Sequence, residues 1–153
     1  MMKYVFLLAF LCTSLYASIQ SSGISFDYEN ATREERMAWM DHQIALVDKR
    51  FARTLSRKYG LNNVIKIEDT KRQGSRAIRT TIKMMMQASH QEGARYATEM
   101  AELFCKQYMP LPLADHSIPV QVAIHDIGGR QVARTIIRPS TCDEASGAEG
   151  ARS

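Results

Sequence analysis

The spacing of the apolar residues changes once along the chain, and this change limits the folds that the sequence can adopt. Before a proline-punctuated stretch, residues 109–117, apolar side chains recur three or four positions apart, which is the period of an α-helix. After this stretch they alternate, which is the period of a half-buried β-strand. Helices followed by strands are typical of an α+β domain.

A first long helix is predicted between Thr32 and Gly60. Thr32 and Glu35 have the T-x-x-E spacing of a capping box, and Gly60 is suited to end a helix because it adopts positive φ without strain. The apolar positions between them fall on one stripe: Met37, Met40, Ile44, Val47, Phe51 and Leu55.

A possible short strand and a second long helix are expected next. Val64, Ile65 and Ile67 form a β-branched run, so residues 62–68 are a candidate strand. The second helix is expected from about residue 70 or 73 to about residue 108, ending before Pro110. Its apolar stripe consists of Ile78, Ile82, Met85, Tyr96, Met100 and Leu103.

The alternating segment predicts a β-hairpin. Val120, Val122 and Ile124 face one way, the stretch DIGGR supplies a glycine turn, and residues 131–138 return as the partner strand. Alternation then places Ala133, Thr135 and Ile137 inside and Arg130, Arg134 and Arg138 outside.

The predicted fold class is α+β, with two long helices packed on a small antiparallel sheet and one disulfide. The hairpin and the residues CDEA that follow it resemble the C-terminal domains of TolA- and TonB-like envelope proteins, which also set helices against a small sheet.

The N-terminus has the pattern of a secretory signal peptide. Lys3 precedes an apolar run that ends in small residues, so residues 1–17 are expected to be removed, with cleavage after Ala17 or, as an alternative, after Ser18. A lipoprotein signal at Cys12 fits less well, because the residues before it are large. Residues 18–29 are then a flexible leader, residues 30–142 a single domain, and residues 143–153 a disordered tail. A periplasmic or secreted location follows, and no later segment approaches the roughly 20 apolar residues of a membrane span.

The cysteines predict a disulfide. The chain has three, and removal of the signal peptide leaves Cys105 and Cys142. In an oxidising compartment an even pair indicates a disulfide. Free thiols or metal ligands are the alternative, which no CxxC pattern supports.

Positive charge is concentrated in one segment. Residues 49–83 contain eleven Lys or Arg and two acids, a local balance of +9 in a chain of net charge +4. If the two helices form an antiparallel hairpin, this charge gathers at one tip. The candidate binding residues are Arg53, Arg57, Arg72, Arg76, Arg79 and Lys83. Solvated side chains, or pairs with acids such as Asp41, are the alternative interpretation.

Catalytic and metal-binding patterns are lacking in the sequence. The four histidines are scattered, and no H-E-x-x-H, G-x-S-x-G or phosphate-binding loop occurs. We therefore expect no catalytic residue, no metal and no cofactor, and a protein that is not an enzyme.

Three classes of function remain. The first is an accessory component of a cell-envelope, secretion or conjugation apparatus that docks onto an acidic protein surface. The second is a binder of an anionic polymer or lipid surface, such as DNA, lipopolysaccharide or phospholipid head groups. The third is a small exported enzyme or toxin. We rank the first class above the second, and the absence of catalytic motifs ranks both above the third.

Overall fold

The chain divides into two compact units, residues 1–31 and residues 32–153. A computed structural model describes residues 25–60 and 64–150. The predicted signal peptide, most of the leader and residues 151–153 of the tail lie outside the described residues, and the proposed domain boundaries remain predictions. In the first unit, the Asp27 carboxylate accepts hydrogen bonds from the backbone and side chain of Asn30, which closes a turn.

The first predicted helix is confirmed as α2, Arg33–Tyr59. Its capping box is complete, because the Thr32 hydroxyl accepts the Glu35 N–H at 3.2 Å and the Glu35 carboxylate accepts the Thr32 N–H at 2.8 Å. Gly60 follows with a φ of 81° and donates its N–H to the carbonyl of Ser56. The predicted stripe supplies four fully buried side chains, Met40, Val47, Phe51 and Leu55.

The second predicted helix is wrong over its first half. Residues 65–84 form a β-hairpin of strands β1, Ile65–Gln73, and β2, Ala77–Met84, and the helix α3 spans only His90–Tyr108. Three β-branched residues in a row, Thr80 to Ile82, favour a strand, and Gly74 turns the chain with a φ of 62°. A second complete capping box, between Ser89 and Glu92, starts α3.

The strands form a mixed four-stranded sheet in the order β1-β2-β3-β4, where β3 is Val120–His125 and β4 is Gln131–Ile137. The β3–β4 pair is antiparallel, so the predicted hairpin is confirmed, with Val122 opposite Thr135. The expectation of a wholly antiparallel sheet is wrong, because β2 pairs with β3 in parallel. Helix α3 carries the chain back between these two strands, as a parallel pair requires.

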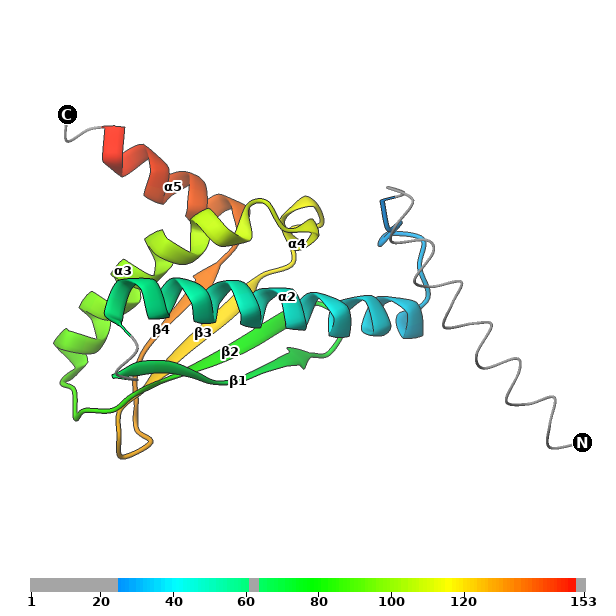
Figure 1. Cartoon of the computed structure of the whole chain (residues 1–153). Helices are drawn as coiled ribbons and strands as arrows, with labels where there is room; N and C mark the ends of the chain where they lie inside the picture. Colours follow the sequence, from blue (N-terminus) through cyan, green and yellow to red (C-terminus); the bar gives the residue numbers. More distant parts are fainter. Residues whose placement is uncertain (1–24, 61–63, 151–153) are drawn as a thin grey trace, which may run out of the picture. The chain divides into compact units, whose positions relative to one another are not determined.

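Helices α2 and α3 lie side by side on one face of the sheet (Figure 1). They meet through Phe51 and Phe104, both fully buried. Gly93 brings α3 close to β4, since a Cβ at this position would lie 2.8 Å from the carbonyl oxygen of Val132. The core therefore fills the space between the helices and one face of the sheet.

The predicted disulfide is confirmed. Cys105, near the end of α3, is bonded to Cys142 in helix α5, Pro139–Gly150, with the Cα atoms 5.3 Å apart. A short helix, α4, Pro112–Asp115, lies between α3 and β3. Helix α5 includes most of the segment that the sequence suggested as a tail. In its first turn, the Cys142 N–H donates to the carbonyl of Arg138. Within residues 25–60 and 64–150, no helix combines the length and the apolar character that crossing a bilayer requires.

Candidate functional site

The structure separates the six basic residues that the sequence grouped at one tip. Arg53 and Arg57 lie on α2, while the other four belong to the β1–β2 hairpin. Arg72 forms an ion pair with Asp41, in the first half of α2, so it faces the helices. Arg76 lies in the turn, and Arg79 and Lys83 lie on β2. These four residues therefore do not share one side of a helix, because a strand places alternate residues on opposite faces.

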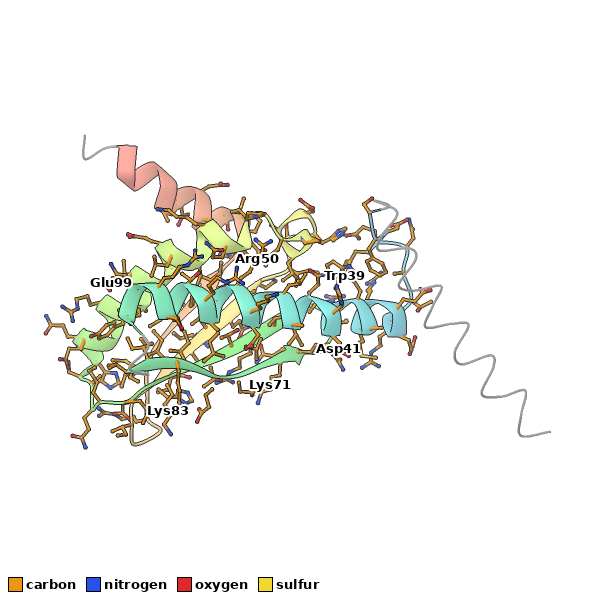
Figure 2. The ribbon with its side chains drawn as sticks, in the orientation of Figure 1. Trp39, Asp41, Arg50, Lys71, Lys83 and Glu99 are labelled. Atoms are coloured by element: carbon orange, nitrogen blue, oxygen red, sulfur yellow. A yellow bond between two sulfur atoms is a disulfide. The ribbon has the colours of Figure 1, made fainter. Side chains whose placement is uncertain are left out.

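Strand alternation defines a surface on the far side of the sheet, which we call the open face. In β2, Ile78, Thr80 and Ile82 are buried against the helices, so Arg79, Thr81 and Lys83 point the other way. Strand register extends this face to the neighbouring strands. Its members are Lys66, Glu68, Asp69 and Lys71 of β1, Arg79, Thr81 and Lys83 of β2, Gln121, Ala123 and His125 of β3, and Arg134 and Ile136 of β4. In Figure 2, Lys71 and Lys83 lie on the side of the sheet away from α2.

The open face carries a net positive charge of +3, from five Lys or Arg and two acids. Lys71 pairs with Asp69 at 3.0 Å, and Lys83 lies 3.7 Å from Glu68. Within the described part of the chain, Lys66, Arg79 and Arg134 have no ion-pair partner. Three cations are therefore available to an acidic partner.

The centre of the open face is built from small residues. Thr81 and Ala123 lie opposite each other on the two central strands, and they are only 8% and 2% exposed although no described helix covers them. Arg79 and Lys83 flank Thr81 on β2, and Gln121 and His125 flank Ala123 on β3. The centre of the open face therefore consists of small residues between longer polar side chains.

All three arginines that were expected to project from the hairpin are exposed: Arg130, Arg134 and Arg138. Arg130 also donates to the Asp126 carboxylate at 3.3 Å and to the carbonyl of Ala88 at 2.7 Å. Its side chain therefore ties the hairpin turn to the segment that precedes α3.

Lys66, Lys71 and Arg134 were not among the predicted binding residues. Lys66 and Lys71 belong to the basic segment of the sequence, but only strand alternation places them with Arg79 and Lys83. The alternation of Ile78, Thr80, Ile82 and Met84 is the signal that could have identified this face.

The four groups with a resolved pKa shift owe it to a helix cap or to burial. The Thr32 and Ser89 caps lower the pKa values of Glu35 and Glu92, mainly through their backbone N–H groups. Burial raises the pKa of Tyr59, whose hydroxyl also donates to Glu99, and burial raises the pKa of Tyr108. Across the described residues, no group of three or more His, Cys, Asp or Glu side chains is arranged to hold a metal ion.

A small cavity of about 170 Å³ lies beside the disulfide, between the end of α3 and α5. Its lining includes Cys105, Met109 and Cys142, with Glu102 and Lys106 at its polar side. It is separate from the open face.

No family model and no curated protein matches the chain. Among solved structures, the chain is similar to the type II secretion system pilotin AspS from Vibrio cholerae. The two are 16% identical, the match covers 71% of this chain and 97% of that chain, and the TM-score is 0.45.

Proposed function

We propose that this protein is an exported, non-catalytic interaction protein that docks onto an acidic protein surface through the open face of its sheet. In this role it is an accessory component of a cell-envelope, secretion or conjugation apparatus. The observation that carries the proposal is the net charge of +3 on a sheet face that no described helix covers. Export is supported by the N-terminal signal pattern and by the disulfide, which persists in oxidising compartments.

The docking residues in this proposal differ in part from those expected from the sequence. Arg79 and Lys83 remain, and Lys66, Lys71 and Arg134 join them. Arg72 faces α2 and pairs with Asp41, Arg76 lies in the β1–β2 turn, and Arg53 and Arg57 lie on the helical layer. These four residues are not assigned to the open face.

Charges of this kind act together. An exposed ion pair contributes about 0–1 kcal/mol, so one substitution changes affinity little. Several complementary charges accelerate association and select the partner, and salt weakens their effect. Binding is therefore expected to fall as ionic strength rises and to be lost only when several cations are reversed.

Site-specific photo-crosslinking in the native envelope tests the proposal. A photoreactive amino acid replaces Arg134 or Lys71, both exposed on the open face, and a control chain carries it at Lys49, exposed on α2. We expect one protein adduct from the open-face positions and none from Lys49. Mass spectrometry of the adduct identifies the partner.

Two matched triple variants then separate the open face from the helical layer. For these variants the photoreactive amino acid is placed at Lys66, which is also exposed on the open face. Lys71→Glu, Arg79→Glu and Arg134→Glu should abolish the adduct formed from Lys66 without lowering the melting temperature. Lys49→Glu, Arg50→Glu and Arg53→Glu make the same change in net charge on α2. This variant should still form the adduct. Loss of the adduct in the α2 variant alone would place docking on the helices and overturn the proposal. Retention on heparin without any protein adduct would identify an anionic polymer as the partner instead.

A further inference from the structure

Two large apolar side chains are exposed together at one end of the sheet. Met85, directly after β2, is 43% exposed, and Ile127, in the β3–β4 turn, is 46% exposed. The Ile127 N–H donates to the carbonyl of Met86 at 3.1 Å, which joins the two loops. We call Met85 and Ile127 the apolar tip.

The backbone holds this tip in place. The Met85 N–H donates to the carbonyl of Val64 at 2.8 Å, so the start of the loop is bonded to the residue that precedes β1. The turn that carries Ile127 is closed by hydrogen bonds from Gly129 and Arg130 to Asp126. The two side chains are therefore presented on fixed loops.

Cations surround the apolar tip. Lys83 precedes Met85 by two residues, Lys66 is opposite Lys83 on β1, and Arg130 closes the turn next to Ile127. Arg130 pairs with the buried Asp126 carboxylate and Lys83 with the exposed Glu68, while Lys66 has no ion-pair partner among the described residues. The surface around the tip therefore presents more positive than negative charge.

We infer that the apolar tip inserts into the head-group region of an anionic phospholipid bilayer, where Lys66, Lys83 and Arg130 contact the phosphates. Apolar side chains bordered by cations provide the two contributions that bind a protein to such a surface, burial of apolar area and attraction to anionic lipid. This interaction goes beyond the proposed protein docking. It uses one end of the sheet and shares Lys66 and Lys83 with the open face, while Lys71 and Arg79 lie about 20 Å from Met85 along the strands at about 3.3 Å per residue.

Vesicle co-sedimentation of the purified exported chain tests the inference. Vesicles of equal parts phosphatidylcholine and phosphatidylglycerol are compared with vesicles of phosphatidylcholine alone. We expect binding to the mixed vesicles, weaker binding at high salt, and at least a tenfold loss in the variant Met85→Ser with Ile127→Ser. Met109→Ser is the matched control, because Met109 is 42% exposed and lies beside the disulfide, and it should bind like the wild type.

A fluorescence measurement detects insertion directly. Ile127→Trp should show a blue shift of its emission on the mixed vesicles, and Met109→Trp should show none. Absence of vesicle binding by the wild type, or full binding by the double serine variant, would overturn the inference.

The two proposals can fail separately. The open-face variant Lys71→Glu, Arg79→Glu and Arg134→Glu should keep the blue shift of Ile127→Trp when the two sets of changes are combined. The double serine variant should keep the protein adduct formed from Arg134. A blue shift that disappears in the combined variant would assign lipid binding to the open face and overturn the inference about the tip.

Discussion

Phe51 of α2 and Phe104 of α3 stack in parallel, with ring centroids 3.9 Å apart and ring planes 1° from parallel. Both side chains are fully buried, so this pair is the contact through which the two long helices share one core. Aromatic pairs of this kind contribute about 0.5–1.5 kcal/mol beyond the burial of their area.

Truncation of this pair should strongly destabilise the protein. We expect Phe51→Ala and Phe104→Ala each to lower the free energy of unfolding by about 3–5 kcal/mol, because each leaves a cavity in the core. The double variant should lose less than the sum of the two, since the stacking energy is removed only once. Urea unfolding of all four proteins measures this coupling. Strict additivity would show that the stack contributes nothing beyond burial.

Gly93→Ala should be destabilising even though alanine is the better helix former. A Cβ at this position would lie within 2.9 Å of the backbone and Cβ of Val132, so α3 or β4 must shift. We expect a net loss of about 1–3 kcal/mol, measured as a lower melting temperature. Gly147→Ala in α5 is the control, because no atom lies within 4 Å of its added Cβ. Equal effects at both positions would contradict the role given to Gly93.

The disulfide should contribute measurably to stability. Cys105 and Cys142 are 37 positions apart, and cross-links over such distances typically stabilise by about 2–4 kcal/mol. The double variant Cys105→Ser with Cys142→Ser should unfold at lower urea concentration. Reductant added during unfolding should shift the wild type towards the variant and leave the variant unchanged. A reductant effect of similar size on both proteins would rule out this explanation.

The capping box of α3 should make stability depend on acidic pH. Hydrogen bonds from the Ser89 backbone and side chain lower the pKa of Glu92 below its ordinary value of 4.5. A carboxyl group with a lowered folded pKa stabilises the protein above its unfolded pKa, and this contribution is lost as pH falls through the folded pKa. Glu92→Gln should therefore melt below the wild type near neutral pH and converge with it at lower pH. A melting difference that does not change with pH would contradict this assignment.

Local signals predicted α2, the β3–β4 hairpin and the disulfide. Thr32 and Gly60 determine the ends of α2 through hydrogen bonds within a few residues, and Val120, Val122 and Ile124 alternate without interruption. Cys105 and Cys142 left one possible pairing after the signal peptide was set aside. For α2 and the hairpin, the residues that decide the structure lie within a short stretch of sequence. For the disulfide, only one pair of cysteines remained.

The β1–β2 hairpin was missed because its apolar spacing fits two structures. Ile78 and Ile82 are four positions apart, which suits one side of a helix and equally one face of a strand. Thr80 and Thr81 favour the strand, but the pairing with β3 that fixes it lies far away in the sequence. The Ser89 capping box was the local signal that could have placed the start of α3. Without the strand, the open face could not be predicted, because its cations come from three strands, β1, β2 and β4.

The parallel seam between β2 and β3 also affects how the protein reaches its fold. The β1–β2 and β3–β4 hairpins join neighbours in sequence, whereas Ile78 meets Val120 only after α3 and α4 have formed the connection between them. Contacts between distant residues are slow to form, so we expect the two hairpins to appear early and the seam to close late.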